Sequence, residues 1–155
     1  MSVKPLSLIS INIENSKHIS FVGTFLTSRD ADIVCLQEVL ESTFVDYKNK
    51  LQMHGRFCPM TIRKRDDSGI IEPEGVAVLS KHPIIENEGH YYRGDANNLK
   101  NWDKSTLQSL METVYAVLSK CTISLNGEIF TIITTHFTWT PDGQPNEYQK
   151  EILKR

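Results

Sequence analysis

Four polar side chains in this sequence could act together on a phosphate ester. Asn12 and Glu38 each follow an apolar run, Glu74 precedes one, and His136 ends a threonine-rich one. An amide oxygen and a carboxylate are hard ligands suited to Mg²⁺, which needs only one or two protein carboxylates when a substrate phosphate completes its shell. A histidine beside a carboxylate can give or take a proton near neutral pH. The set predicts metal-assisted phosphoester hydrolysis, provided that the fold brings all four residues to one edge of a sheet.

The segment DADIVCLQEV, residues 30–39, raises the sharpest question about these residues. Its apolar centre is typical of a strand that is covered on both faces, yet Gln37 and Glu38 follow directly. A charged carboxylate is unfavourable in such a place. Glu38 therefore either lies past the strand end in solvent or is held beside a cation or hydrogen-bond donor that stabilises its charge. The segment alone leaves both readings open.

The elements that must position these residues begin with a strand–helix–strand unit. Residues 6–14 are mostly β-branched or apolar, which predicts a strand with Asn12 at its C-terminal end. Apolar residues then recur at helical spacing over 18–28, and a second strand covers 30–37. Because such a crossover makes the two strands parallel, Asn12 and Glu38 should lie at the same edge of the sheet.

The two predicted helices have candidate capping residues. Asn15 or Ser16 can supply the N-cap of the first helix, and Ser42 that of a second, amphipathic helix over 41–53. The last ten residues, 146–155, also begin like a helix.

In the middle of the chain the residue pattern becomes typical of strands. Strands are predicted at 56–64, 75–81, 83–92, 113–125 and 128–137. The last two are joined by Asn126 and Gly127, a strong signal for a two-residue hairpin turn, so antiparallel pairing is expected. Two polar segments without periodicity, 63–74 and 93–106, are predicted to be surface loops. If the strand after Glu74 is antiparallel to its neighbours, the four polar groups meet at one rim.

Bulk composition limits the classes of protein that remain. The 155 residues are 39% hydrophobic and 23% charged, with a formal net charge of −2, which is typical of one globular domain. The charge argues against a protein that coats DNA non-specifically. Three widely spaced cysteines disfavour a disulfide framework and a zinc site. With neither a signal peptide nor a membrane span in the sequence, we expect a cytoplasmic protein.

Several segments together resemble the successive motifs of the endonuclease/exonuclease/phosphatase superfamily. In order and spacing they are LISINIEN, DADIVCLQEV, EGVAVLSKHPI, TIITTHFTW and NEYQKEILKR, which span roughly residues 6–155. The superfamily includes apurinic endonucleases, pancreatic-type deoxyribonucleases, neutral sphingomyelinases, inositol polyphosphate phosphatases and tyrosyl-DNA phosphodiesterases. The Gln-Glu pair at the strand end is its most specific mark.

This resemblance implies a role for each candidate residue. Glu38 would be the principal ligand of Mg²⁺, with Mn²⁺ as an alternative, and Asn12 would assist at the metal and the phosphate. His136 would lie beside the scissile phosphate. Glu74 resembles the glutamate that partners that histidine in the deoxyribonuclease branch, although Glu72 lies only two residues away. The substrate would be a phosphoester of a nucleic acid, a lipid or an inositol.

The resemblance also implies an α/β (α+β) fold, a four-layer sandwich of two mixed, largely antiparallel sheets flanked by helices. The 155 residues would supply about half of it, including a sheet face that expects a partner sheet. The superfamily carries an Asp-x-Asn and a Ser-Asp-His motif after the helix that corresponds to NEYQKEILKR, and the 155 residues end within that helix. We therefore expect residues 1–155 to form one C-terminally incomplete domain. A catalytically inactive half that needs a C-terminal partner segment is the alternative to an active hydrolase.

Other residues have weaker claims to a site. The run from Arg63 to Arg65 could meet phosphates, but Asp66 and Asp67 follow at once, so a solvated loop is favoured. Trp102 and Trp139 fall in or beside loops on the expected site side and could contact substrate, but packing is the default interpretation.

Overall fold

The computed structural model describes residues 5–137, 144 and 147–152. Its helices are α1 (Ile19–Arg29), α2 (Glu41–Lys50), α3 (Leu107–Thr113) and α4 (Glu147–Ile152), with a short 3₁₀ turn at Ala96–Asn98. Its strands are β1 (Leu8–Asn12), β2 (Ile33–Leu40), β3 (His54–Lys64), β4 (Ile71–Ser80), β5 (Ile84–Arg93), β6 (Ala116–Leu125) and β7 (Glu128–Thr134).

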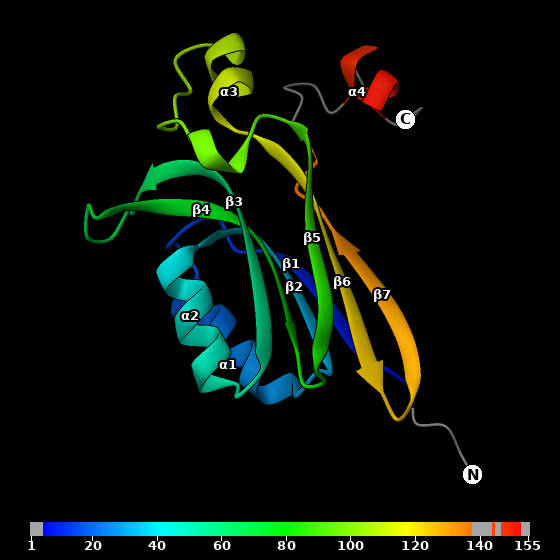
Figure 1. Cartoon of the computed structure of the whole chain (residues 1–155). Coiled ribbons are helices and arrows are strands. Elements are labelled where there is room, and N and C mark those ends of the chain that lie inside the picture. The colour runs from blue at the N-terminus through cyan, green and yellow to red at the C-terminus, as the bar shows by residue number, and fades with distance from the viewer. Residues whose placement is uncertain (1–4, 138–143, 145–146, 153–155) are drawn as a thin grey trace.

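The first sheet contains four strands in the order β1-β2-β4-β3. β1 and β2 are parallel, with Asn12 opposite Gln37, while β4 runs antiparallel to both β2 and β3. The predicted strand–helix–strand unit and its parallel pairing are therefore confirmed. Helices α1 and α2 cover one face of this sheet (Figure 1). Val22, Leu26 and Phe44 pack there against the strands, and this burial fixes the sheet edge at which Asn12 and Glu38 lie.

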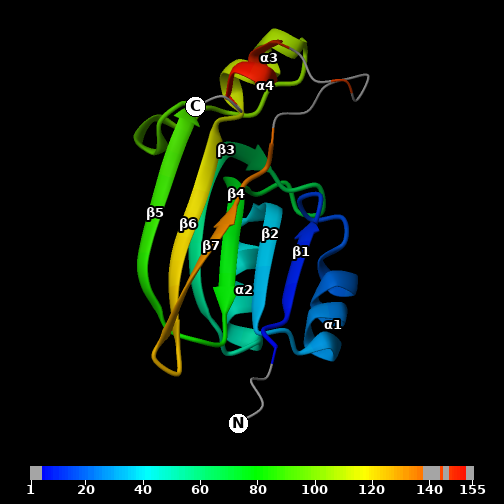
Figure 2. The same cartoon turned by 90° about the vertical axis from the view of Figure 1, so that its right-hand side faces the viewer.

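The second sheet contains three antiparallel strands in the order β5-β6-β7 and lies against the other face of the first (Figures 1 and 2). Cys121 and Ile123 of β6 pack onto Ile33 and Cys35 of β2. The predicted α/β class and two-sheet architecture are confirmed. The inner face that was expected to lack a partner sheet is instead covered by β5, β6 and β7 of the same chain.

Turn chemistry explains the connection between β6 and β7. Asn126 and Gly127 both have positive φ, 53° and 87°, as a two-residue hairpin turn with matching twist requires. The hairpin predicted from these two residues is thus confirmed.

Three local predictions were wrong. Only residues 65–70 of the predicted loop 63–74 lie between strands, because β3 runs to Lys64 and β4 begins at Ile71. Residues 107–113 form α3, and β6 begins only at Ala116. The predicted N-caps are also displaced: His18 precedes α1 and Leu40 precedes α2, and neither side chain accepts a capping hydrogen bond. The strand segments beside the β3–β4 turn were not predicted because their charged residues interrupt the apolar pattern. These segments hydrogen-bond to each other, while their polar side chains face solvent or the site.

Within the described residues, no helix is both long enough and apolar enough to cross a membrane.

Candidate active site

A β-bulge points Glu38 off the buried strand. The register between β2 and β4 shifts between Gln37 and Val39, and Glu38 has a φ of 51°, in the left-handed region. Gln37 donates hydrogen bonds to Ser10 Oγ at 3.2 Å and to Thr134 Oγ1 at 3.0 Å. Gln37 therefore ties β2 to β1 and to the second sheet, while the bulge turns the next side chain toward the site.

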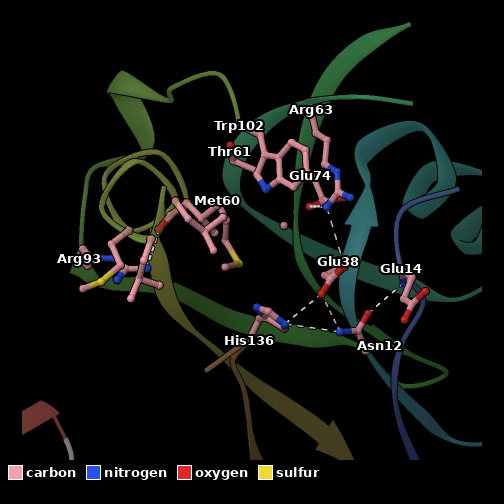
Figure 3. Close-up of a pocket in the computed structure, with 15 residues that line it drawn as sticks. Asn12, Glu14, Glu38, Met60, Thr61, Arg63, Glu74, Arg93, Trp102 and His136 are labelled. Carbon is pink, nitrogen blue, oxygen red and sulfur yellow. Dashed lines mark hydrogen bonds and ion pairs between the residues drawn. The ribbon is translucent and has the colours of Figure 1, made fainter. Parts of the chain in front are cut away.

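Asn12, Glu38 and His136 form one hydrogen-bonded cluster (Figure 3). Asn12 Nδ2 donates to Glu38 Oε1 at 2.9 Å and lies 3.4 Å from His136 Nε2. His136 Nε2 lies 3.2 Å from the same carboxylate oxygen. The backbone N–H of Glu14 donates to Asn12 Oδ1 at 2.9 Å, which fixes the orientation of the amide. Residues distant in sequence therefore meet at the rim where β1 and β2 end.

Glu74 lies in the same pocket but has different partners. Its Oε1 accepts a hydrogen bond from Arg63 Nη1 at 3.0 Å, and its Oε2 accepts one from Asn15 Nδ2 at 3.0 Å. The predicted pairing of Glu74 with His136 is thus absent from the structure, where Glu38 takes that place. The alternative residue, Glu72, instead accepts bonds from the backbone and hydroxyl of Ser42, outside the pocket.

Arg63 is the positive charge that links the two carboxylates. Its Nη1 lies 3.9 Å from Glu38 Oε2 as well as 3.0 Å from Glu74. The guanidinium stacks over the ring of Trp102, 4.3 Å from its centroid. Trp102 is held there because its backbone N–H donates to the Ile62 carbonyl at 2.8 Å. The prediction that Arg63 lies in a solvated loop was wrong, because Arg63 lies on β3 and lines the pocket. Trp102 lines the pocket as well.

Asn15 is a second residue that sequence reasoning did not assign to the site. It is fully buried, and its backbone N–H donates to the Glu38 carbonyl at 3.0 Å while its side chain holds Glu74. Its φ of 64° suits an asparagine in a tight turn. The signal that could have found it is its place directly after the β1 end, in the turn that faces Glu38. Trp139 lies outside the described residues.

The two carboxylates differ in their electrostatic state. The hydrogen bond from His136 lowers the pKa of Glu38 from 4.5 to about 2, with further help from Asn12 and Arg63 and against the effect of burial. Burial raises the pKa of Glu74, while Arg63 and Asn15 oppose the rise. Glu38 is therefore ionised at neutral pH.

These side chains line a pocket of about 470 Å³. Its polar lining includes Asn12, Glu14, Glu38, Arg63, Glu74 and His136. Its apolar lining comprises Met60, Leu107, Leu110, Met111 and Val114, and Thr61, Gly75, Arg93 and Trp102 complete the pocket. Such a volume holds a small ligand with convergent polar groups.

The donor set fits Mg²⁺ bound together with substrate. The described residues contain no cluster of three or more His, Cys, Asp or Glu side chains that could hold a metal by themselves. One ionised carboxylate and one amide oxygen suffice for Mg²⁺ when water and a phosphate complete the shell. Glu38 supplies the carboxylate, and the Asn12 amide lies beside it with its Nδ2 toward Glu38 and its Oδ1 accepting from the Glu14 N–H.

Comparisons with known proteins agree with this picture. The model of the endonuclease/exonuclease/phosphatase family matches residues 9–152. A search of the curated proteins found no match.

Three solved structures illustrate the similarity of fold. A family protein from Leptotrichia buccalis has a TM-score of 0.63 and 15% identity, over 97% of this chain and 61% of its own. Humanised D. rerio TDP2 has a TM-score of 0.59 and 16% identity, over 88% of this chain and 52% of its own. Truncated Caenorhabditis elegans TDP2 has a TM-score of 0.58 and 17% identity, over 88% of this chain and 48% of its own. The chain therefore spans about half the length of these structures.

Proposed function

Because the chain belongs to the endonuclease/exonuclease/phosphatase family, we propose that it contributes the metal-binding half of a Mg²⁺-dependent phosphoester or phosphodiester hydrolase. The observation that carries this proposal is the cluster of Asn12, Glu38 and His136 at the rim of the pocket. In it an ionised carboxylate, an amide and an imidazole lie within hydrogen-bonding distance of one another, beside the guanidinium of Arg63.

The proposed roles follow from these contacts. Glu38 and Asn12 would hold Mg²⁺, with Mn²⁺ as a substitute, and a bound cation would neutralise charge that develops on the phosphate. His136 Nε2 lies 3.2 Å from Glu38 Oε1, where the imidazole can hydrogen-bond a phosphate oxygen or an attacking water. Arg63 adds a fixed positive charge whose planar guanidinium suits phosphate.

A second candidate function is a half-domain that binds phosphate and metal but hydrolyses nothing alone. The structures that share its fold are about twice as long, and this favours a requirement for further residues. Under this reading the same four side chains bind substrate, and a complementing segment supplies the remaining catalytic groups.

Hydrolysis measured with and without Mg²⁺ tests the first candidate. A chromogenic phosphodiester incubated with the 155-residue chain should be hydrolysed only when Mg²⁺ or Mn²⁺ is present. Glu38→Gln should lower that rate by at least about a hundredfold, because an amide cannot neutralise the cation. Glu41→Gln is the matched control, since Glu41 lies three residues on and is exposed.

The outcomes separate the two candidates. Metal-dependent hydrolysis that is lost in Glu38→Gln but kept in Glu41→Gln supports the enzyme. Absence of hydrolysis together with metal-dependent binding of inorganic phosphate supports the half-domain. Equal hydrolysis by both variants would refute a metal site at Glu38.

A further inference from the structure

The apolar lining of the pocket includes a helical stripe that the core uses only in part, since Val114 packs against a core cluster while no residue of α3 is buried. Leu107, Leu110 and Met111 of α3 and Val114 after it follow one another at spacings of three, one and three residues, which places them on one helical face. None of the residues of α3 is buried, and Leu107 is 45% exposed. All four side chains line the pocket.

A short helix would normally bury such a stripe against a sheet. Here the helix is anchored at its start by Thr106, whose side chain accepts from the N–H of Ser109, and at its end by Thr113. Asp103 is bonded to Thr113 as well, which fixes the preceding loop against the helix. The apolar stripe is therefore held in a set orientation toward the pocket by polar contacts outside it.

The stripe faces the charged cluster across one cavity. Met60 of β3 is buried and extends the apolar wall toward Arg63 and Glu74, as Figure 3 shows. Methionine side chains adapt their shape to different apolar groups. A ligand that fills the cavity must therefore present a phosphate on one side and an apolar group on the other.

We propose that the pocket takes a phosphoester whose phosphate carries an aryl or alkyl substituent, and that Met60, Leu110 and Met111 bind this substituent. The inference rests on the proposed function, which places the phosphate beside Glu38, Arg63 and His136. An apolar substituent gains from leaving water at this wall.

The same wall disfavours a polyhydroxylated substituent. The five apolar lining residues have aliphatic or thioether side chains, which offer no strong hydrogen bond to a hydroxyl group. Thr61 and Arg93 also line the pocket, but Thr61 Oγ1 donates to the Lys100 carbonyl at 3.0 Å and Arg93 Nη2 to the Val114 carbonyl at 2.7 Å. Burying hydroxyl groups without partners is unfavourable. The ring of Trp102 already has the Arg63 guanidinium over it, with the Lys104 ammonium 5.2 Å from its centroid. Phosphates of inositol are therefore the poorest of the three substrate classes for this pocket.

Binding of small phosphates to the 155-residue chain in the presence of Mg²⁺ tests the proposal. Calorimetric titration compares inorganic phosphate, methyl phosphate, phenyl phosphate, octyl phosphate and inositol phosphate. Phenyl or octyl phosphate should bind at least about tenfold more tightly than methyl phosphate, because burial of a few methylene-sized groups gives a change on the order of one decade. The phenyl and octyl arms distinguish an aryl from an alkyl substituent.

Polar variants of the wall locate the effect. Leu110→Asn and Met111→Gln keep the side-chain size but should remove most of the preference for the apolar ligand, while inorganic phosphate binds as before. Val45→Thr is the control, because Val45 is 44% exposed on α2, outside the pocket. Circular dichroism verifies that each variant keeps its fold.

Each result decides a separate point. Equal binding of methyl, phenyl and octyl phosphate would overturn the apolar subsite while leaving the phosphate site intact. Tighter binding of inositol phosphate, or an unchanged preference in both wall variants, would overturn it too. If none of the five compounds binds, the subsite and the proposed function both fail.

Discussion

Glu38 is a carboxylate whose charge is stabilised by three neighbours at the end of a buried strand. Asn12 and His136 contact one oxygen at 2.9 and 3.2 Å, and Arg63 lies 3.9 Å from the other. These contacts lower its pKa to about 2. The stabilising donor, rather than exposure to solvent, explains why a glutamate can follow an uninterrupted apolar run.

Two glutamates of β4 provide a matched test at the residue scale. Glu74→Gln should weaken phosphate binding about tenfold, because the amide no longer neutralises Arg63 and the guanidinium loses its fixed position. The variant should also unfold about 1–3 kcal/mol more easily, since Glu74 is 5% exposed and its partner Asn15 is fully buried. Titration calorimetry and urea denaturation measure the two effects.

Glu72→Gln is the control for this change. Its carboxylate accepts hydrogen bonds from Ser42 of α2 and from Arg65, which directly follows β3, so stability should fall while phosphate binding stays unchanged. If the two variants lost phosphate binding equally, the assignment of Glu74 to the pocket would be incorrect.

At the scale of elements, the β3–β4 hairpin carries much of the site. Arg63 lies on β3 and Glu74 on β4, and the register between the strands shifts between Pro59 and Thr61. Gly75 sits at this irregularity, where an added Cβ would lie 2.0 Å from the Cys58 carbonyl oxygen. A glycine here allows the two backbones to approach closely.

Replacing this glycine should disturb both fold and site. We expect Gly75→Ala to lower the free energy of unfolding by at least about 2 kcal/mol, because β3 must shift to admit a methyl group. Gly127→Ala is the comparison: its Cβ would meet nothing within 4 Å, but its φ of 87° is positive, so a loss of about 1 kcal/mol is expected. Urea unfolding midpoints that fall equally in both variants would contradict the close packing at Gly75.

The strand–helix–strand unit could be predicted because its signals are local. Continuous apolar runs and helical spacing define β1, α1 and β2 without reference to the rest of the chain. The strand ends around residues 63–74 could not be predicted, since Arg63, Glu72 and Glu74 are charged and only cross-strand pairing makes them part of a sheet. Helix α3 was missed because its apolar stripe is short and lines a pocket instead of a core.

At the scale of the whole molecule, thiols lie buried where the two sheets meet. Cys35 and Cys121 are 3% and 0% exposed and pack in the same cluster as Ile123. Burial raises the pKa of each thiol from 9.0 to about 11. Packing between the sheets therefore depends on both thiols remaining protonated.

Stability should consequently fall as the pH rises from about 9 to about 11. Below pH 9 the thiols are protonated in the folded and unfolded states alike, and above it the unfolded thiols ionise first, which favours unfolding. The expected loss at pH 10 is roughly 1 kcal/mol for each thiol. Urea denaturation at pH 7 and pH 10 measures it.

Two substitutions identify the source of this pH dependence. Cys35→Ala removes one titrating group, so its free energy of unfolding should fall less between pH 7 and pH 10 than that of the unsubstituted chain. Val78→Ala shortens a side chain of the same cluster without changing any ionisable group, and should keep the full loss. The same pH dependence in Cys35→Ala would show that this thiol does not contribute.

The core of the site could be predicted from single residues at strand ends, but its supporting groups could not. Asn12, Glu38 and His136 are recognisable because each follows or ends an apolar run of sequence, although β2 continues past Glu38 to Leu40 and β7 ends at Thr134. Asn15 and Arg63 act through contacts across 59 and 11 residues of sequence, respectively, and such pairs become visible only when β1 and β4 are placed in one sheet.

The central claim is that a divalent cation binds at the rim where β1 and β2 end, with Glu38 as its anchor. Titration of the isotope-labelled chain with Mn²⁺, followed by nuclear magnetic resonance, tests it most directly because the paramagnetic ion broadens nearby amide signals. We predict saturable broadening at Asn12, Glu38 and His136 that Mg²⁺ reverses, that Glu38→Gln abolishes and that Glu41→Gln retains. Broadening that is absent from these three residues, or unchanged in Glu38→Gln, would contradict the account.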